Sequence, residues 1–155
     1  IFGPRMGFKH VIPHLVERFY KNDENPFKIY GSEQTRAFCY ITDASEGTVL
    51  AMENEQSDQE IYHMGLPEEI TIAELVKAVG NIMGYNGDYI NAPTYPGSVF
   101  RRCPDITKSR EELGYSPKIS WRDGLNETIL WYKKFFESGK PVFSGGFKPP
   151  DDLNY

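Results

Sequence analysis

The sequence predicts an α/β fold, in which a small sheet has helices on its flanks. Short stretches rich in β-branched and aromatic residues, bounded by glycine, proline and asparagine, alternate with stretches in which apolar residues recur at helical spacing. The expected elements are also too irregular to form a complete doubly wound domain. We therefore expect one portion of such a fold, and the elements below are taken in chain order.

The first helix is expected at about residues 13–20, because apolar residues there recur every three or four positions (Val11, Ile12, Leu15, Val16 and Phe19). The residues expected to end it are Asp23, Asn25 and Pro26. Residues 27–30 then form a short strand, and residues 36–41 form a second strand after a turn.

Thr42 and Asp43 are suited to cap the next helix. Its apolar positions are Ala44, Val49, Leu50 and Met52. Residues 60–64 follow as a third expected strand, closed by Gly65 and Pro67.

A capping box gives the clearest helix start, since Thr71 and Glu74 can each satisfy a backbone donor of the other. The helix that it opens has one apolar face (Ile72, Leu75, Val76, Val79 and Ile82). A strand is expected at 88–92. After a loop rich in proline and glycine, helices are expected at 107–113 and 121–136.

Length and composition indicate a single compact domain. The chain has 155 residues, 39% hydrophobic and 25% charged, which is enough to build one core. We expect the domain over residues 1–137 and an extended tail over the glycine- and proline-rich residues 138–155. The net charge of −5 argues against binding to nucleic acid or membrane, although two or three arginines can still bind a small anion. No signal peptide or membrane-spanning run is evident, so the expected location is the cytoplasm.

Six motifs occur in the order in which one large enzyme family carries them. They are Phe2-Gly-Pro-Arg-Met6, His10-Val-Ile-Pro13, Ile29-Tyr-Gly31 with Gln34-Thr-Arg36, Arg101-Arg-Cys-Pro-Asp-Ile106, Leu113-Gly-Tyr-Ser-Pro117, and Gly124-Leu125 with Trp131-Tyr132. Each motif is weak alone, but their order is specific. The chain resembles the extended short-chain dehydrogenase/reductase family over residues 1–136, specifically its NAD-dependent nucleotide-sugar epimerases, dehydratases and decarboxylases.

The resemblance implies a nucleoside-diphosphate sugar as substrate and NAD as cofactor. A whole enzyme of this family oxidises the sugar at C4, then epimerises, dehydrates or decarboxylates it and returns the hydride. This chain resembles the carboxyl-terminal, substrate-binding portion, with an extended Rossmann-type NAD-binding half expected upstream as its partner.

Two sequence features of the catalytic half are absent. None of the ten tyrosines has a lysine four residues later, and no glycine-rich dinucleotide fingerprint occurs. In the family the Tyr/Lys pair transfers protons at the sugar, and its lysine holds the ribose of NAD. We therefore assign no catalytic residue and expect this chain to be inactive alone.

A diphosphate is best held by guanidinium groups, which match its oxygens with paired donors. By resemblance, Arg36 approaches the ribose and phosphate from the second strand, and Arg102 approaches the pyrophosphate from the opposite loop. Arg101 is the second choice, because it is adjacent and could exchange roles with Arg102. The alternative for each arginine is an ordinary surface ion pair.

Four further residues are substrate-binding candidates by resemblance. Tyr30 and Phe27 flank the strand expected beneath the base, where aromatic rings can stack, although strand packing is the stronger expectation for Phe27. His10 and Val11 occupy the loop where relatives place a basic residue and a backbone donor near the phosphates.

The remaining candidates concern the cofactor and metals. Ile1 and Gly7 would border the nicotinamide side of the cleft, and would contact NAD only together with the other half. His63 stands where many relatives have asparagine, so the contact made by that asparagine does not carry over directly. No metal site is expected, since His10 and His14 lack a third ligand.

Two alternatives stay open at this stage: a non-catalytic binding or structural subunit that keeps the fold, and one polypeptide of a split enzyme. The start at Ile1, inside a motif, favours an enzyme fragment. Apolar surface would then be exposed, so we expect a marginally stable or self-associating chain that forms homo-oligomers. Uridine and guanosine are the leading bases, and these residues do not separate epimerase from dehydratase or decarboxylase.

Overall fold

The computed structural model describes residues 1–94 and 96–139. The helices within this part are α1 (Val11–Lys21), α2 (Ile41–Glu53), α3 (Ile72–Met83), α4 (Thr107–Leu113) and α5 (Trp121–Glu137), with a 3-10 turn η1 (Glu55–Ser57). The strands are β1 (Phe27–Tyr30), β2 (Thr35–Ala37), β3 (Glu69–Thr71), β4 (Tyr89–Ala92) and β5 (Arg101–Arg102). The α/β class with small sheets and flanking helices is thereby confirmed.

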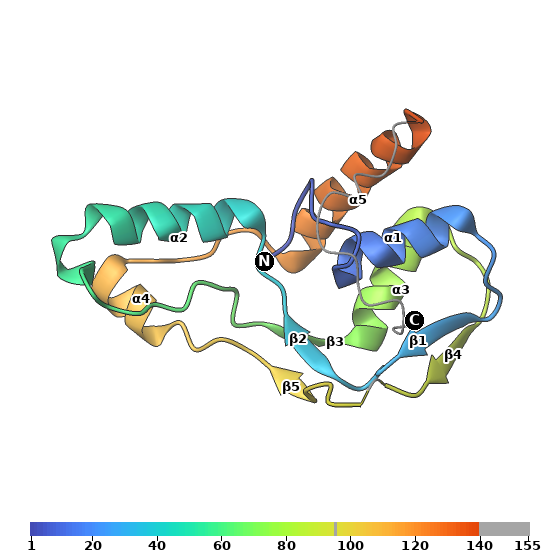
Figure 1. The fold of residues 1–155 in the computed structure, drawn as a ribbon, viewed down its shortest axis with the longest axis horizontal. Coiled ribbons are helices and arrows are strands. Elements are labelled where there is room, and N and C mark those ends of the chain that lie inside the picture. The colour runs from blue at the N-terminus through green and yellow to red at the C-terminus, as the bar shows by residue number, and fades with distance from the viewer. Residues whose placement is uncertain (95, 140–155) are drawn as a thin grey trace.

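The elements form two groups joined by a narrow sheet (Figure 1). Helices α1, α3 and α5 gather with β1 and β4 at one end, and α2 lies with α4 at the other. Between them β2 is the central strand of three, antiparallel to β3 and parallel to β5. The chain leaves β1 through a short turn and enters β2, so this turn connects the helical group to the central sheet.

The hydrophobic core lies in the first group. It consists of apolar side chains that α1, α3 and α5 present to β1, including Ile12, Val16, Phe27, Ile29, Leu75, Val79, Leu125 and Ile129. Strands β1 and β4 pair in parallel, with Phe27 beside Tyr89 and Tyr30 beside Ala92. The helical spacing seen in the sequence therefore marks the faces that are buried.

Several predicted elements are confirmed. The capping box is present, because Thr71 Oγ1 accepts from the Glu74 amide (3.1 Å) and the Glu74 carboxylate accepts from the Thr71 amide (2.7 Å). Helices α4 and α5 and strands β1 and β4 match their predictions to within one residue, and α1 begins two residues before its predicted start. Most of the predicted tail, residues 140–155, lies outside the described part. No helix in the described part is both long and apolar enough to cross a membrane.

Two strand predictions are wrong in whole or in part. Strand β2 ends at Ala37, and beyond it Tyr40 makes only an isolated parallel bridge to Phe2. Residues 60–64 form no strand, while β3 and β5 were not predicted. A β-prone sequence becomes a strand only where a neighbouring backbone offers hydrogen bonds, and such neighbours are a property of the tertiary fold.

The predicted cap of α2 is also wrong. The helix begins at Ile41, with Tyr40 as its N-cap residue and no side-chain cap. Asp43 is instead buried (3% exposed), and its Oδ2 accepts from the backbone amides of Lys118 (3.0 Å) and Ile119 (2.9 Å). This carboxylate therefore holds α2 against the segment that follows α4.

Candidate functional site

A buried amide side chain ties the turn between β1 and β2 to the loop between β4 and β5. Gln34 is 7% exposed; its Nε2 donates to Thr94 Oγ1 (2.9 Å) and its Oε1 accepts from Ser98 Oγ (2.9 Å). Gly31 begins this turn with φ of 65°, a conformation that favours glycine. In the sequence Gln34 stands out only as part of a motif, because its bridging role depends on a loop sixty residues away in the chain.

Arg36, on the central strand β2, braces the same loop. Its Nη1 donates to the carbonyl oxygens of Thr35 (2.7 Å) and Phe100 (3.2 Å). Its Nη2 donates to the carbonyl oxygen of Val99 (2.6 Å) and to Gln34 Oε1 (3.3 Å). All four acceptors are neutral, so these contacts orient the guanidinium without cancelling its positive charge.

The second arginine of the predicted pair lies directly beside the first. Arg36 and Arg102 are register partners on the parallel strands β2 and β5. Side chains of directly opposed residues project from the same face of a sheet, and adjacent strands lie about 4.8 Å apart. Burial lowers the pKa of Arg36, and the positive charge of Arg102 lowers it further. The structure thus brings two repelling cations together, which is a feature common at functional sites.

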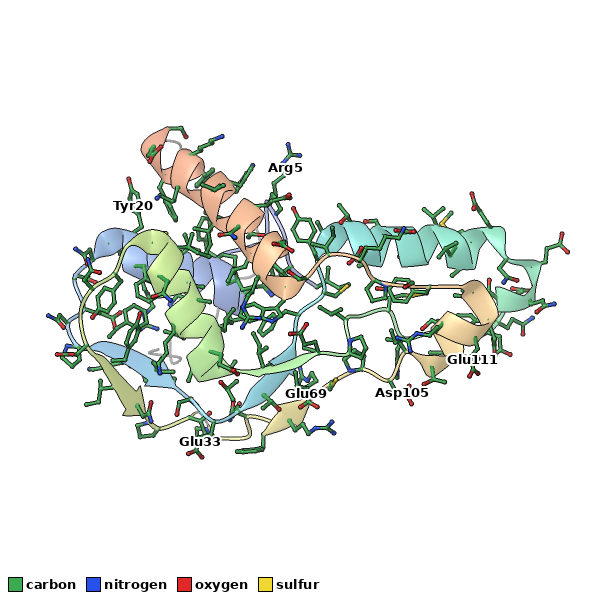
Figure 2. The ribbon with its side chains drawn as sticks, turned by 180° about the vertical axis from the view of Figure 1, so that it is seen from behind. Arg5, Tyr20, Glu33, Glu69, Asp105 and Glu111 are labelled. Atoms are coloured by element: carbon green, nitrogen blue, oxygen red, sulfur yellow. The ribbon has the colours of Figure 1, made fainter. Side chains whose placement is uncertain are left out.

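Arg101 lies on the other face of β5. It is paired in register with Thr35, and its Nε donates to both carboxylate oxygens of Glu69 (2.9 and 3.0 Å). Figure 2 labels Glu69 beside this strand. Hydrogen bonding to Arg101 is the main cause that lowers the pKa of Glu69. Because side chains alternate along a strand, Arg101 cannot exchange roles with Arg102, and the ion-pair alternative describes it.

A cavity of about 450 Å³ lies beside Arg102. Its lining comes from Ala37 and Cys39, in β2 and the segment that follows it, from His63 and its neighbours, from Cys103, and from Ile1. Ile1 is 66% exposed. The exposed residues around this cavity include three that the sequence singled out, Ile1, His63 and Arg102.

A second cavity, of about 490 Å³, lies between the end of α1 and β1. His14 and Arg18 line it from the helix, and Lys28 and Tyr30 line it from the strand. Arg18 donates to the carbonyl oxygen of Lys28 (2.9 Å) and makes a two-point contact with Glu24 (2.7 and 2.6 Å). Burial, followed by the charge of Arg18, lowers the pKa of His14. Tyr30, one of the four aromatic and loop candidates, borders this cavity, whose volume is that of a ligand site.

Phe27 requires a correction. Its ring is 1% exposed and stacks on Phe19, with ring centroids 3.9 Å apart, so it belongs to the core and cannot stack on a base. His10 and Val11 are exposed at the start of α1, where His10 is the N-cap residue without a side-chain cap bond. Gly7 is exposed in the preceding turn, where its carbonyl accepts from the His10 amide (3.0 Å). These three positions stay predictions.

Residues 1–94 and 96–139 contain no group of three side chains arranged to hold a metal ion. Both cysteines are free: burial raises the pKa of the Cys39 thiol, and burial and the charge of Glu69 raise that of Cys103. Neither thiol is therefore an activated nucleophile.

Known proteins resemble this chain in sequence and in fold. The family described as NAD dependent epimerase/dehydratase matches residues 1–65. Among curated proteins, the chain is 32% identical over 144 residues to the UDP-N-acetyl-alpha-D-glucosaminuronate decarboxylase of Bacillus cytotoxicus, covering 86% of this chain and 44% of that protein. It is 33% identical to the putative GDP-L-fucose synthase 2 of Oryza sativa, covering 85% of this chain and 40% of that protein.

A solved structure shares the fold of this chain. UDP-glucuronic acid 4-epimerase from Bacillus cereus, in complex with UDP-glucuronic acid and NAD, superimposes with a TM-score of 0.77 at 29% identity, over 86% of this chain and 43% of that one. The chain belongs to the NAD-dependent epimerase/dehydratase family. It spans less than half the length of these relatives.

Proposed function

We propose that this chain is the nucleotide-sugar-binding part of an NAD-dependent epimerase, dehydratase or decarboxylase, in which Arg36 and Arg102 hold the diphosphate of the substrate. The observation that carries the proposal is their pairing on β2 and β5, which sets two guanidinium groups on one face. A diphosphate carries about two negative charges, and binding it relieves the repulsion between the two cations.

The two arginines have different tasks in this proposal. Arg36 is already held by four acceptors, so it fixes the loop of Val99 and Phe100. Its positive charge is therefore in a fixed position before the substrate binds. Arg102 is exposed and contributes the donors that contact phosphate directly. Pre-organisation of Arg36 lowers the ordering cost of binding, because its side chain does not have to be immobilised by the ligand.

The nucleoside is proposed to lie at the cavity beside β1, with Tyr30 against its base or ribose. Tyr30 is followed directly by the turn that leads to Arg36, so a nucleotide can extend along this turn from the cavity to the arginine pair. Relatives that are named for UDP-sugars and for a GDP-sugar both match this chain, so uridine and guanosine are the bases to compare.

NAD is the cofactor implied by the family, and the described residues do not fit it by themselves. Ile1 borders the Arg102 cavity and Gly7 lies in an exposed turn, and the sequence has no glycine-rich fingerprint to cradle its phosphates. In our proposal NAD is bound mainly by a separate NAD-binding half, and this chain alone does not turn over a nucleotide sugar.

Isothermal titration calorimetry of the purified chain with UDP-glucose, UDP-glucuronic acid and a GDP-sugar tests the proposal. We expect Arg102→Ala to weaken binding by at least about tenfold, because a charge-assisted contact to phosphate is lost. Arg101→Ala is the matched control and should change affinity less than about twofold, since that side chain lies on the opposite face. Equal affinity for wild type and Arg102→Ala would contradict the diphosphate assignment.

A further inference from the structure

His14 is a partly buried histidine whose ring has no hydrogen-bond partner among the residues that the structure describes. Its backbone amide donates to the carbonyl oxygen of His10 (3.1 Å) within α1, but neither ring nitrogen makes a hydrogen bond in residues 1–94 and 96–139. A polar group that is withdrawn from water without a partner costs free energy, so native proteins rarely leave one. This imidazole lines the cavity between α1 and β1, where a ligand can supply the missing partner.

The fold directs this ring toward the aromatic candidate of the same cavity. A short connection follows α1, and β1 then runs back along it (Figure 1). Arg18, four residues after His14, contacts β1 directly: it donates to the carbonyl oxygen of Lys28 (2.9 Å), and its guanidinium carbon lies 4.1 Å from the centroid of the Phe27 ring. Residues four apart share a helix face, so His14 faces β1 one turn farther from the connection. The end of β1 that is farther from the connection is Tyr30, which lines this cavity with His14.

The charged groups of this cavity are already paired or can reach water. Arg18 and Glu24, which are partly buried, are joined by their two-point contact. Asp23 and Lys28 are exposed, where water can satisfy them. The imidazole of His14 is therefore available to a molecule that enters the cavity.

The charge state of His14 distinguishes a base from a phosphate as its partner. Burial, followed by the charge of Arg18, lowers the pKa of His14, so the ring is neutral near pH 7. A phosphate is bound best by a cation, whereas a neutral imidazole offers one N–H donor and one bare nitrogen acceptor. The edges of uracil and guanine carry a carbonyl oxygen beside a ring N–H, and either group suits one of these two nitrogens.

We propose that His14 recognises the base of the nucleotide sugar, with one ring nitrogen hydrogen-bonded to the edge of a base that lies against Tyr30. The inference rests on the proposed function and deepens it, because it assigns to the nucleoside a contact separate from the arginine pair. A ligand that has a diphosphate but no base cannot make this contact.

Calorimetry of the full chain with UDP-glucose and with inorganic pyrophosphate, which has no base, tests the assignment. His14→Phe fills the same space without a hydrogen-bonding nitrogen. We expect it to weaken UDP-glucose binding about five- to tenfold, the effect of one neutral hydrogen bond, and to change pyrophosphate affinity less than about twofold. His14→Gln, whose amide offers both a donor and an acceptor, should recover at least half of the lost binding free energy.

A matched control separates the ring from general effects on α1. Glu17 lies on the same helix, is paired with Lys21 and is not part of the cavity lining. Glu17→Gln should leave both affinities within about twofold of wild type. Unchanged UDP-glucose affinity in His14→Phe, or an equal loss for UDP-glucose and pyrophosphate, overturns the role of His14.

A second measurement needs no variant. In the wild-type chain labelled with ¹⁵N-histidine, saturating UDP-glucose should move the NMR signal of one His14 ring nitrogen, and pyrophosphate should leave both signals in place. Unmoved His14 signals in a chain that binds UDP-glucose refute this inference alone. Absence of UDP-glucose binding refutes the proposed function itself.

Discussion

Replacing Asp43 with alanine should destabilise the chain strongly, because this buried carboxylate holds two parts of the fold together. Its Oδ2 accepts from the amides of Lys118 (3.0 Å) and Ile119 (2.9 Å), and the side chain is almost fully buried. Alanine leaves both amides without this acceptor and removes charge-assisted bonds that contribute about 1.5 kcal/mol or more each. We therefore expect the free energy of unfolding to fall by about 3 kcal/mol.

Urea denaturation followed by circular dichroism measures this change. With a denaturant slope of about 2 kcal/mol/M, the midpoint should move down by about 1.5 M. Asp43→Asn keeps an acceptor oxygen but loses the charge, so it should fall between wild type and Asp43→Ala. Asp58→Ala, at an exposed carboxylate, is the control and should stay within about 0.5 kcal/mol of wild type. An Asp43→Ala chain as stable as that control would show that the two contacts do not hold α2 in place.

Two further predictions concern stability. Gly47→Ala should lower the free energy of unfolding by about 1 to 2 kcal/mol in the same assay, because a Cβ would lie 2.6 Å from Met64 Sδ and 2.8 Å from the buried ring of Tyr115. This overlap should outweigh the better helix propensity of alanine. An unchanged or higher urea midpoint would contradict the close packing of α2. Hydrogen bonding to Arg18 is the main cause that lowers the pKa of Glu24, so its stabilising contribution is present above the ordinary carboxyl pKa of about 4.3 and is lost as pH falls through the lowered value. Glu24→Gln should therefore lose less stability than wild type between pH 5 and pH 3. An equal fall in melting temperature for the two chains over this pH range would refute the coupling between Glu24 and Arg18.

The periodic parts of this fold could be predicted because their signals are local. The capping box of α3, the apolar face of α1 and the strands β1 and β4 each depend on residues close together in the chain. Strand β5 has two residues, and its existence depends on the neighbouring β2 backbone. No pattern within the strand itself could predict it.

The candidate site shows the same division between local and tertiary information. The motifs identified Arg36, Arg102 and Tyr30 as candidates, and the fold places the first two side by side and the third at a cavity. They could not show that Arg101 faces Glu69 on the other side of the strand. They also placed Phe27 among substrate contacts, although its ring lies in the core.

By itself the sequence determined the α/β class and the helices, because side-chain type and spacing act between residues close together in the chain. Its ordered motifs indicated the family and, by resemblance, the candidate arginines. The tertiary structure alone decided which arginines share a face, which acceptors surround Arg36, and which residues line the two cavities. Those properties depend on strand register and on carbonyl groups up to 64 residues away. Hydrogen-bond geometry at such separations is set by how the whole chain packs.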